Sequence, residues 1–250
     1  MAKKLHLKPV MDAAPVYQAL YQCMVGKWIF LTHTRPDIAY AASIVSTFMN
    51  QLQKPHARAV KHIYRYLRGT KNFALFYRQG GDFNLHGFTD ANWAGDTHDK
   101  KSTNGYMFMS SSSPRTWNSK KQPTVVLSST KSEHMAVTEG TKEALWLRRL
   151  FGELRIQESN LPTTIYGDNQ GSINLAHNPV YHGRTKHIEV KHHFIREKVA
   201  SGEIKLEYIP TSDQIADTLT KPLGQTAFER LRNQLGLVQV NSQRPIPSRL

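Results

Sequence analysis

Cysteine is nearly absent from this sequence: Cys23 is the single one among 250 residues. One cysteine excludes an internal disulfide framework and a cysteine-based zinc site, and it is typical of a reducing intracellular compartment. No run of 18 apolar residues occurs, so we expect no membrane span. The first ten residues, MAKKLHLKPV, have no apolar stretch after their lysines, so we expect no secretory signal there.

Acidic residues are also scarce. Nineteen Asp and Glu stand against 33 Lys and Arg, which gives a formal net charge of +14 and a pI near 9.9. Such an excess indicates a polyanionic partner, most often nucleic acid, because phosphate contacts release counterions. An anionic membrane surface is the weaker alternative, and a basic protein without such a partner stays open.

The longest acid-free stretch runs from Ile38 to Gly81 and contains the pattern of a basic helix, PHARAVKHIYRYLRGT. Val60, Ile63, Tyr64 and Leu67 share an apolar face, and a basic face lies beside it. That face can follow a phosphate backbone, although a merely solvated face fits the pattern equally well. The candidate nucleic-acid contacts are Arg58, Lys61, Arg65 and Arg68.

The hydrophobic pattern changes near residue 80, and we expect three parts. Residues 1–80 form a helical segment, residues 81–224 an α/β domain, and residues 225–250 a terminal helix followed by a disordered tail. The α/β domain is predicted as a mixed sheet covered by helices. Its expected strands lie at 83–90, 104–110, 114–119, 163–167 and 203–210. Its expected helices lie at 129–154, 169–177, 186–202 and 213–221, and a further helix is expected at 228–236.

Four carboxylates of this basic chain fall at the ends of expected elements. Asp90 closes the strand FNLHGFTD, at a sheet edge where α/β folds place ligand chemistry. Glu133 precedes by one turn the apolar stripe of a long helix, Val137, Gly140, Ala144, Leu147 and Phe151. An unpaired carboxylate on that stripe would be costly, so it needs a cation or a partner. An ordinary strand end and a first-turn glutamate favoured by the helix dipole are the alternative interpretations.

The other two carboxylates are Asp168 and Asp217. Asp168 ends TTIYGD, where an N-cap is the competing interpretation. Asp217 follows the strand EIKLEYIP, and Asp213 is the better capping candidate there. Carboxylates gathered at one edge would repel each other without a cation, and Mg²⁺ prefers oxygen ligands. Two such ions about 4 Å apart can hold the attacking and leaving oxygens of a phosphodiester.

Twelve histidines suggest zinc as an alternative, but His192 and His193 are adjacent, so they point to different helix faces, and no cysteine joins them. His187, which follows Lys186, suits phosphate contact better.

Four segments together resemble the ribonuclease H domain of copia-type LTR retrotransposons. They are TDANWAGD, TWNSKKQPTVVLSSTKSEHMAV, YGDNQGSINLAHNPVYHGRTKHIEVKHHFIRE and IPTSDQIADTLTKPL. The upstream stretches LTHTRPDIAYA and HARAVKHIYRYLRGT are similar to the segment that follows the polymerase in the same polyproteins. The resemblance implies a five-stranded ribonuclease H-like sheet whose catalytic, metal-binding carboxylates are Asp90, Glu133, Asp168 and Asp217. It also implies two Mg²⁺ ions, with Mn²⁺ as a substitute.

Cleavage of the RNA strand of an RNA–DNA hybrid is therefore the expected activity, in a cytoplasmic virus-like particle or in the nucleus. The polymerase of the parent polyprotein is a candidate partner, but the polymerase motif YxDD is absent. Further candidate contacts to the hybrid are Ser129, Asn169, Gln170, Arg184, Lys186 and His187.

The sequence departs from the family at three places. SSTKSEH replaces SSTEAEY around the glutamate, Gly167 stands where cysteine is frequent, and IPTSDQIAD leaves no room for the histidine loop of bacterial and retroviral ribonucleases H. A nucleic-acid-binding module without nuclease activity is therefore the alternative function. An integrase-like strand transferase would need three acids at another spacing and a zinc-binding extension.

Overall fold

The computed structural model of the chain describes residues 7–8, 13–14, 16–50, 52–77, 83–156, 161–177 and 186–240. The chain divides into two compact units. Residues 1–77 and 223–250 form the first, and residues 78–222 form the second. None of the helices in the described residues is long and apolar enough to cross a membrane.

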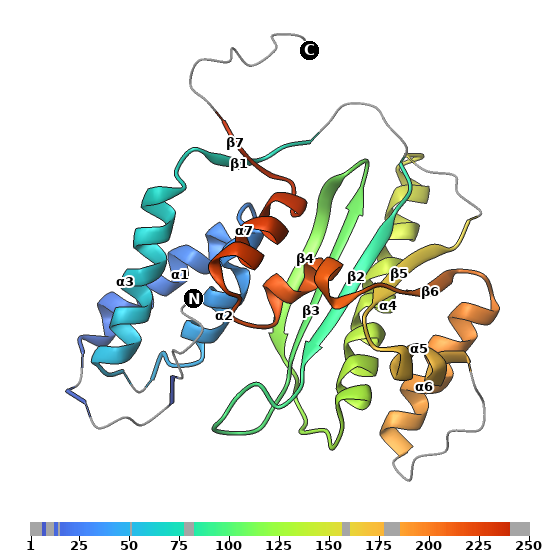
Figure 1. Ribbon diagram of the computed structural model, residues 1–250, viewed down its shortest axis with the longest axis horizontal. Coiled ribbons are helices and arrows are strands. Elements are labelled where there is room, and N and C mark those ends of the chain that lie inside the picture. Colours follow the sequence, from blue (N-terminus) through green and yellow to red (C-terminus); the bar gives the residue numbers. More distant parts are fainter. Residues whose placement is uncertain are drawn as a thin grey trace. The chain divides into compact units, whose positions relative to one another are not determined.

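The second unit is built on a five-stranded mixed sheet with the strand order β4-β3-β2-β5-β6 (Figure 1). Strand β2 pairs antiparallel with β3, β3 pairs antiparallel with β4, and β2-β5-β6 are parallel. This architecture confirms the predicted α/β class and the five-stranded mixed sheet. The strands are β2 (His86–Asn92), β3 (Thr103–Ser110), β4 (Ser113–Lys121), β5 (Thr163–Gly167) and β6 (Ile204–Tyr208).

Helix α4 (Ser129–Glu153) crosses one face of this sheet. It begins where the side chain of Ser128 accepts a hydrogen bond from the backbone N–H of Lys131 (3.3 Å). The predicted apolar stripe is buried, from Val137 to Phe151. A Cβ on Gly140 would lie 2.5 Å from Cγ2 of Thr89 on β2, so only glycine permits this close approach. Helices α5 (Gln170–His177) and α6 (Lys186–Ala200) pack beside α4 (Figure 1).

The opposite face of β2 and β3 is covered by the short 3₁₀ turn η3 (Ile215–Leu219), which follows another 3₁₀ turn, η2 (Thr211–Asp213). The prediction of an α-helix at 213–221 was therefore wrong. The expected cap at Asp213 was wrong as well, because the backbone N–H of Ala216 donates to the side chain of Gln214 (3.2 Å). A Cβ on Gly105 of β3 would meet Thr220 and Leu219 at 2.7 and 2.8 Å, so a strand glycine allows this segment to pack directly on the sheet.

The first unit contains helices and one small sheet. Helices α1 (Gln18–Leu31), α2 (Ala39–Ser46) and α3 (Lys54–Gly69) pack around Trp28, Val45 and Ile63, with η1 (Pro36–Ile38) between α1 and α2. Strand β1 (Phe73–Leu75) pairs antiparallel with β7 (Leu237–Gln239). Helix α7 (Gln225–Gln234) precedes β7. The described residues 225–240 therefore belong to the same unit as the N-terminal helices, and the prediction missed strands β1 and β7. The expected tail at 241–250 lies outside the described residues.

A buried ionic cluster in the first unit joins the segment RPDI (residues 35–38) to helix α3. It explains why a charged Arg and Asp stand in this segment. Arg35 donates two hydrogen bonds to the carboxylate of Asp37 (2.9 and 2.6 Å). Tyr66 of α3 donates to the same carboxylate (2.5 Å), and Arg35 also bonds Thr70 after α3. Burial, together with the charge of Asp37, raises the pKa of Tyr66 to about 12. The phenol therefore stays protonated and keeps donating.

Replacing Tyr66 by phenylalanine should lower the free energy of unfolding by about 1–3 kcal/mol, the usual contribution of a hydrogen bond to a buried charge. Urea denaturation measures the change. The matched control is Tyr64→Phe on the same helix, because Tyr64 is 37% exposed and its loss of a hydroxyl should cost little. Equal effects of the two substitutions would show that the bond to Asp37 contributes nothing.

Candidate active site

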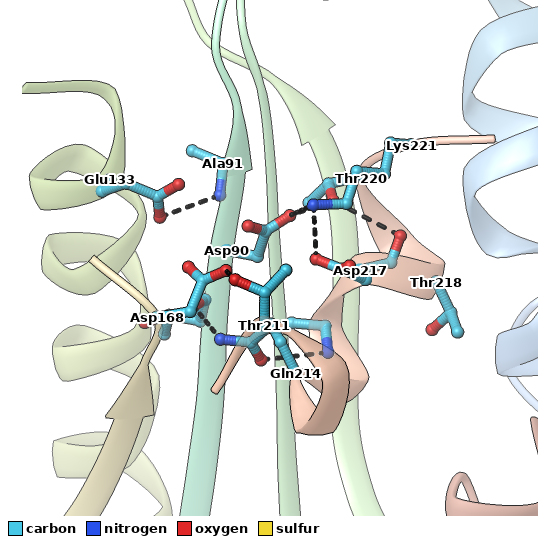
Figure 2. A network of polar contacts seen from close by, with 12 residues as sticks. Asp90, Ala91, Glu133, Asp168, Thr211, Gln214, Asp217, Thr218, Thr220 and Lys221 are labelled. Atoms are coloured by element: carbon cyan, nitrogen blue, oxygen red, sulfur yellow. Dashed lines mark hydrogen bonds and ion pairs between the residues drawn. The ribbon is translucent and has the colours of Figure 1, made fainter. Parts of the chain in front are cut away.

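Three aspartates from distant parts of the chain meet at one end of the sheet of the second unit (Figure 2). Asp90 lies near the end of β2, Asp168 directly follows β5, and Asp217 lies in η3. One carboxylate oxygen of each lies within 4.8 Å of the others. Asp90 and Asp217 are buried, with 1% and 5% of their surface exposed. We call these three residues the aspartate cluster.

Glu133 approaches the same place from the first turns of α4 (Figure 2). Its carboxylate is buried and accepts a hydrogen bond from the backbone N–H of Ala91 (3.1 Å). Ala91 directly follows Asp90 on β2, so this bond holds α4 against the strand that carries the first aspartate. Glu133 is not among the residues whose ligand atoms lie within the 4.8 Å cluster. It borders the cluster, and its carboxylate bonds the backbone of β2.

The segment after β6 contacts every member of the aspartate cluster. Thr211 donates to Asp168 (2.8 Å), and Thr220 donates to Asp90. Lys221 forms an ion pair with Asp217, and Gln214 donates to the backbone carbonyl of Thr89 (2.9 Å). Sequence reasoning missed these four residues. The available signal was their position, because they flank Asp217 in a short segment that follows the last strand.

Burial and mutual repulsion raise the pKa values of Glu133, Asp217 and Asp90. Burial, with the charges of Asp90 and Asp168, raises the pKa of Glu133 to about 10. Burial and the charge of Asp90 raise the pKa of Asp217 to about 7, and burial raises the pKa of Asp90 as well. Each shift means that the metal-free site resists holding all its negative charges at once.

The donor set fits hard divalent cations. Every candidate ligand atom is a carboxylate oxygen, which is the ligand that Mg²⁺ and Mn²⁺ prefer. The raised pKa values provide the second indication, because a bound cation would relieve the repulsion that causes them. The cluster is thus compatible with divalent metal binding.

The remaining predicted contacts are placed only in part. Ser129 and Gln170 are exposed at the starts of α4 and α5. Asn169 accepts a hydrogen bond from the backbone N–H of Ser172 (2.9 Å), so Asn169 caps α5 and Asp168 is not needed as a cap. Arg184 and the side chains of Lys186 and His187 lie outside the described residues.

The basic face of α3 is exposed as predicted. Among the described residues, none of its four basic side chains, Arg58, Lys61, Arg65 and Arg68, takes part in an ion pair. The apolar face is narrower than predicted: Val60 and Ile63 are buried, whereas Tyr64 is 37% exposed.

Comparison with known proteins finds relatives of high identity. The chain is 44% identical over 220 residues to the retrovirus-related Pol polyprotein from transposon RE1 of Arabidopsis thaliana, which covers 88% of the chain and 15% of that protein. It is 40% identical over 238 residues to the Pol polyprotein from transposon TNT 1-94 of Nicotiana tabacum, covering 95% of the chain and 18% of that protein. A smaller relative, secreted RxLR effector protein 161 of Plasmopara viticola, is 42% identical over 128 residues, which are 51% of the chain and 90% of that protein. No protein-family model matches the chain.

Among solved structures, the chain is similar to RNase H1 from Halobacterium salinarum (TM-score 0.40) and to LC11-RNase H1 in complex with RNA/DNA hybrid (TM-score 0.41). Each is 13% identical, and each match covers 55% of this chain and 94% of that one. These superpositions are too loose to add to what the strand order and the positions of the acids show.

Proposed function

We propose that the second unit is a metal-dependent ribonuclease H that cleaves the RNA strand of RNA–DNA hybrids. The premise is that the chain belongs to the Pol polyproteins of copia-type transposons. The chain spans 15–18% of the length of the Pol polyproteins compared, so this activity is proposed for the present segment alone. The aspartate cluster is the observation that carries the proposal. Three aspartates expected from the sequence lie together at the end of the sheet and Glu133 borders them, in a chain with a formal charge of +14.

In this proposal Asp90, Asp168, Asp217 and Glu133 hold the metal ions. Two bound Mg²⁺ ions would supply charge compensation for the attacking and leaving oxygens of the phosphodiester. Thr220 and Thr211 fix the orientation of the carboxylates of Asp90 and Asp168. The backbone N–H of Ala91 fixes that of Glu133. The protein's contribution is to hold these oxygens in place before the substrate arrives.

The proposed substrate contacts lie around the acids and on α3. Ser129 and Gln170 are exposed at helix starts in the second unit, where polar groups suit the 2′-hydroxyls that distinguish RNA from DNA. Arg58, Lys61, Arg65 and Arg68 are proposed to neutralise phosphates. The polymerase of the parent polyprotein remains a proposed partner.

The direct test incubates the purified chain with an end-labelled RNA paired to DNA, in Mg²⁺, in Mn²⁺ and in chelator. Single-stranded RNA and duplex DNA of the same sequence serve as controls. We expect internal cuts in the RNA of the hybrid alone, and only with metal. Tight binding of the hybrid without any cut would instead support the nucleic-acid-binding module.

The basic face of α3 can be tested separately by the salt dependence of hybrid binding. Replacing Arg58 and Lys61, or Arg65 and Arg68, by glutamine should reduce the slope of log K against log salt by about 1.5 per pair, because each lost phosphate contact removes roughly 0.7–0.9. The control pair is Lys142→Gln with Lys205→Gln, which removes exposed lysines paired with Glu139 and Glu207. If the control pair reduces the slope as much as a pair on α3 does, the basic face of α3 contributes only net charge.

A further inference from the structure

Lys221 places an ammonium group among the buried acids (Figure 2). Its Nζ lies 2.7 Å from Oδ1 of Asp217 and 3.9 Å from Oδ2 of Asp90. The side chains of these aspartates are 7% and 2% exposed, whereas that of Lys221 is 30% exposed. The ammonium therefore reaches the cluster from the solvent side, on a flexible stem.

Among the described residues, Lys221 is the basic side chain that forms an ion pair with the aspartate cluster. Lys121 offers a comparison, because its side chain is 29% exposed and also contacts two aspartates, Asp96 and Asp99 (2.5 and 2.9 Å). Those two partners are 22% and 34% exposed, so water screens the Lys121 pair. The partners of Lys221 are buried, where the same charge has a larger effect.

We propose that Lys221 is the resident counter-cation of the aspartate cluster, a positioning residue that a divalent ion must displace from the oxygens of Asp217 and Asp90. This inference rests on the metal site of the proposed function. The ammonium occupies one lone pair of the Asp217 carboxylate and repels a divalent ion bound at the same oxygens, so the two cations compete for this site. The four-carbon stem of lysine allows the ammonium to move into solvent without any change of the backbone.

Two properties follow from this competition. Without metal, Lys221 holds Asp217 and Asp90 together although they repel each other, so the site is already assembled when a cation arrives. With metal, the freed ammonium becomes accessible to solvent.

The first experiment titrates the chain with Mn²⁺ alone at pH 8, without nucleic acid, and measures free Mn²⁺ by electron paramagnetic resonance. Lys221→Met should bind Mn²⁺ at least about tenfold more tightly, since it removes a competing unit charge only a few ångströms away. It should also lower the melting temperature of the metal-free protein. Lys221→Arg keeps the charge and should stay near the parent in both measurements, and Lys121→Met should change neither.

The second experiment measures acylation of lysines by mass spectrometry in the parent chain. Saturating Mn²⁺ should increase the acylation rate of Lys221 several-fold relative to that of Lys121. No increase at Lys221, or unchanged or weaker Mn²⁺ binding by Lys221→Met, would overturn the displacement. Absence of Mn²⁺ binding in the parent chain would instead contradict the proposed metal site itself, so the two failures are distinguishable.

Discussion

Replacing Asp168 by asparagine should reduce cleavage of the hybrid at least about a thousandfold, because the variant loses a carboxylate from the proposed metal site, where bound ions would supply several kcal/mol of charge stabilisation. Binding of the hybrid should persist, since phosphate contacts elsewhere on the chain are unchanged. Single-turnover cleavage and fluorescence anisotropy measure the two quantities. Asparagine keeps an oxygen that can accept the hydrogen bond from Thr211, so the fold should survive.

The matched control for this substitution is Asp213→Asn. Asp213 is an exposed aspartate of η2, the same turn that contains Thr211. Its replacement removes an equal charge close to the site and should leave cleavage within about threefold of the parent, as expected for a charge that solvent screens. A cleavage rate of Asp168→Asn equal to that of the parent would show that Asp168 has no catalytic role.

The second large effect is expected for Glu133→Gln. This substitution should raise the melting temperature without metal and lower it, relative to the parent, with metal. The pKa of Glu133 lies near 10 in the folded chain, against about 4.3 in the unfolded chain. This carboxyl group therefore stabilises the fold below pH 4, and that contribution is lost as the pH rises toward 10. Glu133→Gln stays neutral throughout. Without metal, its melting temperature should therefore match the parent near pH 4 and exceed it increasingly toward pH 9.

With Mg²⁺ the parent should have the higher melting temperature. The variant should lose most of the stabilisation that Mg²⁺ gives the parent, because that stabilisation scales with metal affinity, and it should lose most of the cleavage rate. Calorimetry at several pH values with chelator or Mg²⁺ provides the measurement, with Glu153→Gln at the exposed end of α4 as the control. A lower metal-free melting temperature at pH 9 would show that Glu133 has a structural role, through its bond to Ala91.

The positions of three of the acids could be predicted from the sequence because each of the three depends on a local pattern. Asp90 lies near the end of β2, Asp168 directly follows β5, and Glu133 precedes an apolar stripe with offsets typical of a helix. The contacts that support them could not be predicted. Thr220 reaches Asp90 across 130 residues, and Gln214 reaches Thr89 across 125, so no local pattern contains both partners.

The 3₁₀ turns show why the local pattern failed between residues 213 and 221. The run DQIADTLTK repeats apolar residues at helical spacing, which favours an α-helix. A 3₁₀ turn has three residues per turn, so residues three apart share a face. Gln214, Asp217 and Thr220 have that spacing, and the first and last of them bond β2. Tertiary contacts with β2 thus override the local preference. The short strands β1 and β7, with three residues each, contain too little alternation to be predicted.

The order in which the site's parts occur along the chain also limits when the site can form during synthesis. The strands β2, β3 and β4 and helix α4 lie between residues 86 and 153, so they can pack while the ribosome still holds the rest. Asp217, Thr220 and Lys221 come last, and Thr211 and Gln214 precede them only slightly. A nascent chain therefore carries Asp90 on a sheet with three of its five strands, and Glu133 on the helix beside it, for the time needed to add some 70 further residues. Until then, the polypeptide lacks the last aspartate and therefore the complete set of proposed metal ligands.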